Sequence, residues 1–179
     1  LINLLGRQYE IQKGEILIDD ENIRNWDLRN LRRTMAMVPQ DVFLFSGTIL
    51  ENVRLYHESI SREQVMEACR KVNAHSFIEK LSDGYDTRLN ERGGSLSMGQ
   101  RQLLSFARAL AFDPDILILD EATSNIDTET EILIQNALQI MMKGRTSIII
   151  AHRLSTIKYV NRILVFHKGV LRDTGTHTE

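Results

Sequence analysis

The chain has 179 residues, of which 42% are hydrophobic and 26% charged, and its formal net charge is -2. This length allows one domain with a substantial core, and the composition is that of an ordinary globular protein. The small charge offers no electrostatic basis for binding nucleic acid, so we expect no nucleic-acid partner. Apolar stretches are too short to span a bilayer. The single cysteine, Cys69, excludes an internal disulfide and is expected to be a core residue.

The first two thirds of the chain contain one predicted strand and two predicted helices. The strand is the short apolar segment 16–18. Ser61 and Gln64 have the spacing of a capping box at the start of a helix that extends to about residue 81. A second helix is predicted over 98–111, because its apolar residues recur on one face.

The last third alternates strands with a helix. Residues 116–119, 148–151 and 163–166 are continuous apolar runs, which are typical of strands covered on both faces in a parallel sheet. Asp127 can cap a helix between the first two. We therefore predict an α/β fold with a mainly parallel sheet. A helical segment, about 41–112, is inserted into a core made of 1–40 and 113–179.

Two adjacent carboxylates, Asp120 and Glu121, end the predicted strand 116–119. The carboxyl edge of a parallel sheet is where α/β proteins bind ligands. One acid there can hold a hard cation such as Mg²⁺, and the other can polarise a water molecule. Taken alone, the same residues are equally well explained as a polar turn.

Ser97, Gly99 and Gln100 begin the predicted helix 98–111. Free backbone N–H groups and a hydroxyl at a helix start suit an anionic phosphate, although a simple N-cap explains the pattern as well. Two further residues are candidates by position. Gln40 follows Val38-Pro39, and His152 directly follows the strand 148–151, where it could donate a hydrogen bond to a phosphate.

Together these motifs have the order and rough spacing of an ATP-binding cassette, the nucleotide-binding domain of ABC transporters. The resemblance rests on Gln40, Leu96-Ser97-Met98-Gly99-Gln100, Asp120-Glu121-Ala122-Thr123-Ser124, Asp127 and Ala151-His152-Arg153. It covers the chain from end to end. It implies a core like that of P-loop NTPases with a helical subdomain, and ATP and Mg²⁺ as cofactors.

The resemblance also implies a role for each residue. Asp120 and Gln40 resemble the groups that hold Mg²⁺, with Gln40 also reaching the attacking water. Glu121 resembles the general base, and His152 resembles the histidine that contacts the γ-phosphate. The nucleotide-binding residues of the signature loop, which contacts ATP on the opposite domain, are Ser97, Gly99 and Gln100. Asp127 resembles the aspartate that couples the two sites along the dimer interface.

Three stretches resemble the exporter branch of the family: residues 44–52, 91–94 and 152–156. The implied partners are a second nucleotide-binding domain, identical or different, and a transmembrane domain on the same parent chain. Phe43 and Phe45 would then contact that membrane domain. The implied location is the cytoplasmic face of the cell membrane. The alternatives are a soluble cassette ATPase of DNA repair or translation and a non-hydrolysing binding module.

The sequence departs from the family pattern in two places. It has no glycine-rich loop with a lysine and Ser/Thr, and no upstream aromatic residue for adenine. We therefore expect the sequence to be an excerpt of a longer protein, with a gap in its sheet beside strand 148–151, and the 179 residues alone to be inactive. Met98 replaces a glycine of the signature loop, adding a side chain and restricting the backbone. This predicts one half of a heterodimer with one weak site.

Overall fold

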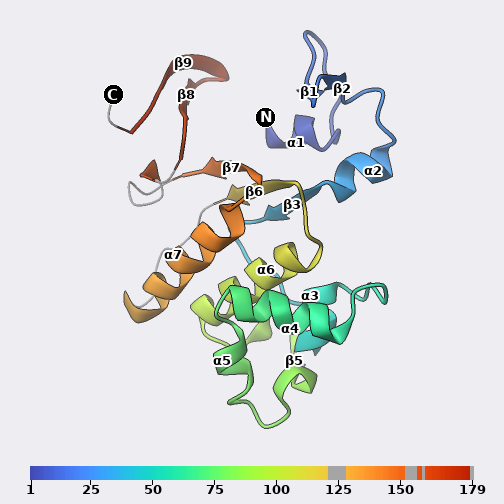
Figure 1. Ribbon diagram of the computed structural model, residues 1–179, viewed down its shortest axis with the longest axis vertical. Coiled ribbons are helices and arrows are strands. Elements are labelled where there is room, and N and C mark those ends of the chain that lie inside the picture. Colours follow the sequence, from blue (N-terminus) through green and yellow to red (C-terminus); the bar gives the residue numbers. More distant parts are fainter. Residues whose placement is uncertain (121–127, 152–156, 159, 178–179) are drawn as a thin grey trace.

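The computed structural model describes residues 1–120, 128–151, 157–158 and 160–177. A three-stranded parallel sheet in the order β3-β6-β7 lies at the centre of the molecule (Figure 1). Its strands are β3 (Met35–Val38), β6 (Ile116–Asp120) and β7 (Thr146–Ile150). The fold is therefore α/β, as predicted. Helices form the part below the sheet in Figure 1, and the two ends of the chain lie above it.

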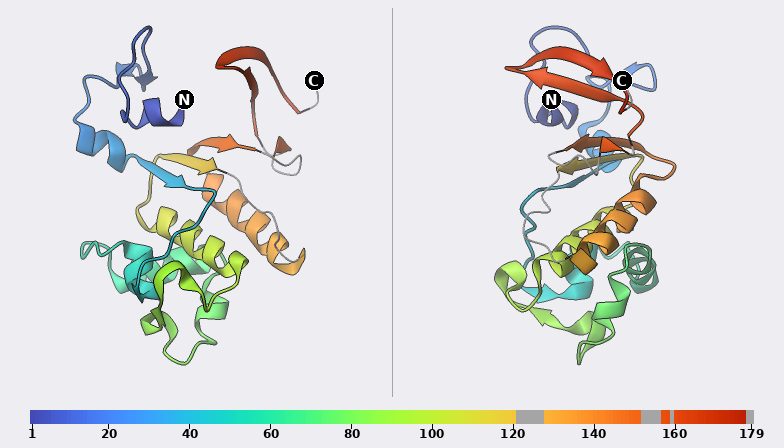
Figure 2. Two further views of the ribbon diagram at one scale, coloured as in Figure 1. Left: turned by 180° about the vertical axis from the view of Figure 1, so that it is seen from behind. Right: turned by 90° about the vertical axis from the view of Figure 1, so that its left-hand side faces the viewer.

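The elements between β3 and β6 are mainly helical. They are β4 (Gly47–Thr48), α3 (Ile49–Arg54), α4 (Arg62–Lys71), α5 (His75–Ile78), the 3₁₀ turn η1 (Gly84–Asp86), β5 (Arg88–Leu89), the 3₁₀ turn η2 (Glu91–Gly93) and α6 (Met98–Ala111). Helix α7 (Thr128–Met142) connects β6 to β7, and α6 and α7 lie on the same face of the sheet (Figure 2).

The remaining elements precede β3 or follow β7. They are α1 (Ile2–Leu5), β1 (Leu17–Ile18), β2 (Glu21–Asn22), α2 (Leu28–Arg33), β8 (Ile163–His167) and β9 (Val170–Gly175). Both short sheets, β1-β2 and β8-β9, are antiparallel.

One hydrophobic core joins the helical part to the sheet. It includes Phe106 of α6, Leu117 of β6 and Ile134 of α7, all nearly or fully buried. Cys69 belongs to the same core and is fully buried. Burial raises the pKa of its thiol to about 12, so Cys69 is a small core residue, as predicted, and not a reactive thiol.

Capping boxes begin two helices where the sequence predicts them. Ser61 accepts a hydrogen bond from the Gln64 backbone, and the Gln64 side chain accepts one from the Ser61 backbone, so α4 begins at Arg62. The predicted helix 98–111 is α6 with the same bounds. Helix α4 ends at Lys71, earlier than predicted.

Two segments predicted as buried strands do form strands, but both are partly exposed and neither belongs to the parallel sheet. Segment 16–18 contributes only the two residues of β1, which pair antiparallel with β2, and Leu17 is 49% exposed. Segment 163–166 lies in β8, which pairs antiparallel with β9, and Phe166 is 52% exposed. In the described part of the chain, β6 is the only strand that β7 pairs with. Strand β7 is thus at an edge of the sheet as far as the described residues go, and the gap beside it stays a prediction.

Two glycines allow a test of the packing around η2. Gly93 has φ +61°, and a Cβ on it would lie 2.7 Å from Cδ1 of Leu44, a fully buried side chain. Gly84 has a similar φ of +52° and no atom within 4 Å of that position.

We expect Gly84→Ala to lower the free energy of unfolding by about 1 kcal/mol, the cost of a left-handed alanine. Gly93→Ala adds overpacking and is expected to cost roughly 1–3 kcal/mol more. Urea unfolding of both variants measures the difference. Equal losses would mean that Leu44 moves aside freely.

Candidate functional site

The parallel pairing of β3, β6 and β7 brings their carboxyl ends to one edge of the sheet. Val38 is in register with Leu119, and Asp120 is in register with Ile150. Asp120, half-buried, is the last residue of β6, and Gln40, exposed, lies two residues beyond β3. The structure thus places both predicted metal ligands at the ligand-binding edge of the sheet.

Three other predicted site residues lie outside the described part of the chain. They are Glu121, Asp127 and His152. Glu121 directly follows β6, and His152 follows Ala151 at the end of β7. Their roles stay predictions.

The start of α6 contains the third group of predicted site residues. The Gln100 backbone N–H donates to Ser97 Oγ over 3.2 Å, and the Ser97 backbone N–H donates to Gln100 Oε1 over 3.0 Å. The N-cap interpretation is therefore correct for the local structure. Gly99 is buried, whereas Ser97 is exposed. No hydrogen bond or ion pair between described residues joins this group to Gln40 or Asp120.

Met98 is the first residue of α6 and is 44% exposed. It is not among the residues with positive φ. A helical conformation suits methionine at least as well as glycine, so Met98 carries no backbone strain here, and its effect on the signature loop stays a prediction. Compared with a glycine, Met98 adds a flexible, partly exposed side chain at the first residue of the helix.

The segment after Gln40 is held by a buried asparagine that the sequence analysis did not single out. Asn52, 1% exposed, accepts a hydrogen bond from the Phe45 backbone N–H at 2.8 Å. Its amide donates to the carbonyls of Phe45 and Thr48 at 2.9 and 3.0 Å. Phe43 and Phe45 are 40% and 43% exposed, and their rings meet edge to face with centroids 5.0 Å apart.

Arg108 of α6 forms hydrogen bonds with the segment that follows Gln40. Its Nε donates to the Asn52 carbonyl over 3.0 Å, and its Nη1 donates to the Phe43 carbonyl over 3.1 Å. The guanidinium lies 5.9 Å from the centre of the Phe45 ring. Burial lowers the pKa of Arg108, but an arginine stays charged at neutral pH. Nothing local in the sequence marks Arg108 for this role.

The donor atoms at the sheet edge suit a hard cation. Asp120 offers carboxylate oxygens, and Gln40 offers an amide oxygen. Mg²⁺ in phosphoryl-transfer sites typically takes one or two protein ligands and completes its shell with water and phosphate oxygens. The described residues contain no group of three or more His, Cys, Asp or Glu that could hold a metal without such help. Among them, no helix has the length and apolar character needed to cross a membrane.

The sequence and the fold are both similar to those of ABC transporters. The ABC transporter family model matches residues 1–124. The probable multidrug resistance ABC transporter ATP-binding/permease protein YheH of Bacillus subtilis is 51% identical over all 179 residues, which cover 27% of that protein. A putative ABC transporter ATP-binding protein of Streptococcus pneumoniae is 52% identical, again over the whole chain and 30% of the relative.

A solved structure of a bacterial Atm1-family ABC exporter with ATP bound superposes with a TM-score of 0.89. It is 41% identical, and the match covers 99% of this chain and 31% of that one. The chain therefore spans about 30% of the length of the relatives it matches.

An alanine in place of Asn52 tests how much the hydrogen bonds of its side chain contribute to stability. Asn52→Ala leaves the backbone groups of Phe45 and the Thr48 carbonyl without their partner, so we expect the free energy of unfolding to fall by about 2–3 kcal/mol. The exposed Asn25 provides the control, and Asn25→Ala is expected to change stability by less than about 0.5 kcal/mol. Urea unfolding measures both. Equal, small effects would show that water replaces the Asn52 amide.

Proposed function

The chain belongs to the ABC transporter family, and on this premise we propose that it is the ATP-hydrolysing motor of an exporter. The observation that carries the proposal is the common edge of β3 and β6, where Gln40 and Asp120 lie together. The relatives described above are transporters and exporters by name. No observation favours a soluble cassette ATPase of DNA repair or translation.

Each candidate site residue has a distinct proposed task. Asp120 and Gln40 hold Mg²⁺, which neutralises phosphate charge when bound. Glu121 accepts a proton from the attacking water, and Gln40 orients that water. His152 donates a hydrogen bond to the γ-phosphate. These assignments follow the resemblance of each residue to the family motif at its position.

The start of α6 is proposed to act on a second nucleotide-binding domain. Ser97, Gly99 and Gln100 contact ATP held by that partner, and Asp127 lies on the shared interface. This division is supported by the hydrogen bonds and ion pairs between described residues, none of which joins the start of α6 to Gln40 or Asp120. The partner is a second copy or a different half. Met98 favours a heterodimer, because its partly exposed side chain stands at the start of α6 where the family's signature loop has a glycine.

The membrane contact is proposed to involve the segment after Gln40. The aromatic side chains of Phe43 and Phe45 are exposed. Exposed apolar patches are typical of surfaces that bind another protein. In this proposal, residues 41–112 form the helical subdomain, inserted between 1–40 and 113–179, that carries these contacts. The domain then works on the cytoplasmic face of the membrane through the transmembrane part of its transporter.

The 179 residues alone are expected to bind MgATP weakly and to hydrolyse none. They contain no lysine-bearing glycine loop, the element that supplies N–H donors and a cation to the phosphates. Isothermal titration with MgATP checks this, with a protein that has such a loop as the positive control. Low-micromolar binding would contradict the expectation.

Glu121→Gln in the intact transporter is expected to slow ATP hydrolysis by about 10²-fold or more, with ATP binding largely kept, because a glutamine cannot accept the proton. Steady-state ATPase activity and nucleotide binding measure the two effects. The matched control is Glu58→Gln, an exposed glutamate outside the site. Undiminished hydrolysis in Glu121→Gln would place the base elsewhere.

A further inference from the structure

Four elements of the core meet around the side chain of Arg145. Helix α6 ends at Ala111, β6 begins at Ile116, α7 ends at Met142, and β7 begins at Thr146, directly after the arginine. The Arg145 side chain is only 19% exposed, so most of it lies inside this junction. None of the tasks proposed above for the candidate site residues involves this arginine.

The guanidinium of Arg145 donates hydrogen bonds through all three of its nitrogens. Nε donates to the Pro114 carbonyl over 2.9 Å, and Nη1 donates to the Met141 carbonyl over 3.2 Å. Nη2 donates to Asp113 Oδ1 over 2.6 Å. Met141 lies in the last turn of α7, where the carbonyls have no partner within the helix. One planar, rigid group therefore joins the end of α7 and the loop before β6 to the start of β7.

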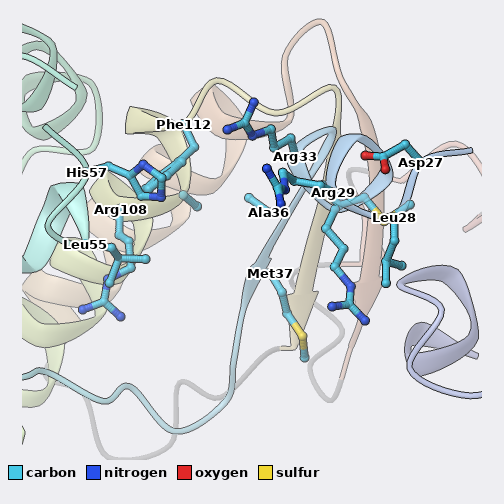
Figure 3. A pocket seen from close by; sticks show the side chains of 13 residues that line it. Asp27, Leu28, Arg29, Arg33, Ala36, Met37, Leu55, His57, Arg108 and Phe112 are labelled. Atoms are coloured by element: carbon cyan, nitrogen blue, oxygen red, sulfur yellow. The ribbon is translucent and has the colours of Figure 1, made fainter. Parts of the chain in front are cut away.

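Packing at the end of α6 fixes the loop that Arg145 binds. Phe112 follows α6, and its ring meets that of His57 edge to face at 5.4 Å. Both side chains lie on the same side of a groove beside the α2–β3 segment (Figure 3). Asp113 comes next, with φ 45°, a left-handed conformation that aspartate adopts more readily than most residues. The carboxylate that Arg145 binds is therefore held on a packed turn.

The hydrogen bonds of Arg145 continue the pairing of β6 with β7. The first pair of this parallel ladder is Ile116 opposite Thr146. The Thr146 backbone N–H donates to the Asp115 carbonyl over 3.1 Å, and the preceding carbonyl, that of Pro114, accepts from Arg145 Nε. A slip of one residue would turn every side chain of β7 to the other face of the sheet. The guanidinium holds β7 against such a displacement at the start of the ladder.

The opposite ends of the same four elements lead to candidate site residues. Helix α6 begins after Ser97, β6 ends at Asp120, α7 begins after Asp127, and β7 ends two residues before His152. Strands β6 and β7 have five residues each, so Arg145 is roughly 16 Å from the ligand-binding edge at about 3.3 Å per residue. Because packed interiors have low compressibility, a displacement at the start of β7 reaches its far end.

We propose that Arg145 is a positioning residue for ATP hydrolysis, which fixes β7 relative to β6 and thereby His152 relative to Asp120. This inference rests on the proposed function for the tasks of these two residues. A misplacement of about 1 Å at a reacting centre can cost roughly 10²-fold in rate. Binding of ATP itself depends mainly on the lysine-bearing glycine loop. Loss of the Arg145 hydrogen bonds therefore slows turnover while nucleotide binding is kept.

The two carbonyl hydrogen bonds of Arg145 carry this role, and the ion pair does not. Asp113 is 87% exposed, and exposed ion pairs contribute little. A lysine at position 145 keeps the charge, but its single nitrogen lacks the planar fork that reaches both carbonyls. An asparagine at position 113 keeps an oxygen acceptor and tolerates the left-handed backbone. Arg145→Lys and Asp113→Asn therefore separate geometry from charge.

Steady-state ATPase kinetics of the intact transporter test the proposal, with kcat expressed per bound nucleotide so that unfolded protein does not count. We expect Arg145→Lys to lower kcat about tenfold and to leave KM for ATP within about twofold. Arg145→Gln, which also removes the charge, is expected to show the same separation of kcat from KM. Asp113→Asn is expected to change each value by less than about twofold.

Ile78→Ala controls for a general loss of stability. Ile78 is a fully buried residue of α5 in the helical part of the chain. The cavity is expected to lower Tm by several degrees, at least as much as Arg145→Lys does, and thermal unfolding compares the two variants. We expect Ile78→Ala to keep its kcat per bound nucleotide, because β6 and β7 stay in place.

Hydrogen exchange of the intact transporter provides a readout that needs no ATP. Mass spectrometry compares the peptide that covers β7 with the peptide that covers α4. Arg145→Lys is expected to speed exchange in β7 about tenfold relative to α4, since the strand is no longer held at its start. Ile78→Ala is not expected to raise this ratio.

Five outcomes would overturn the proposal: an unchanged kcat in Arg145→Lys, a raised KM with kcat kept, an equal fall of kcat in Ile78→Ala, an unchanged exchange ratio in Arg145→Lys, or failure of both Arg145 variants to fold. The last would mean that Arg145 serves stability alone. Each of these leaves the proposed ATPase function intact. Conversely, undiminished hydrolysis in Glu121→Gln would count against that function and leave the exchange result standing.

Discussion

The packing of α6 is the constraint on which the other features depend. This helix has 14 residues and is therefore about 21 Å long at 1.5 Å per residue. Its buried side chains, Leu103, Phe106, Ala107 and Leu110, belong to the core that continues into β6 and α7. Closely packed interiors have low compressibility and transmit strain. The same rigid element therefore carries Ser97 at its start and Arg108 in its last turn, although the two belong to different proposed interfaces.

A second constraint links the sheet edge to the far end of α6. The residues that follow Gln40 alternate in exposure. Leu44 is fully buried, whereas Phe43 and Phe45 on either side of it are exposed. Asn52 fixes this alternation through the backbone of Phe45, and Arg108 fixes Asn52. The aromatic pair is therefore connected to Gln40 along the chain and to α6 through hydrogen bonds.

The sequence predicted the features that depend on local signals. Helix α6 and the start of α4 were found because capping boxes and apolar periodicity act within a few residues. Strand β3 was missed, since Met35-Ala36-Met37-Val38 has only one β-branched residue and is a strand because it pairs with β6. Pairing between distant segments leaves no local mark. The apolar run in β8 was assigned to a parallel sheet for a different reason: its partner β9 follows after the two-residue turn Lys168-Gly169, both with positive φ, and this local hairpin signal was overlooked.

The candidate site shows the same contrast between features with a local sequence signal and features that depend on distant contacts. Asp120 was found because it ends a strand that the sequence predicts, and Gln40 because it follows Val38-Pro39 and resembles the family motif. Asn52 and Arg108, 56 residues apart, were not, because their partners are backbone carbonyls that any sequence supplies. Those carbonyls satisfy the hydrogen bonds of Arg108 but do not cancel its charge, and its partial burial, which lowers its pKa, reduces screening by water. Arg108 thus connects the buried Asn52 to the exposed aromatic pair while its charge is retained.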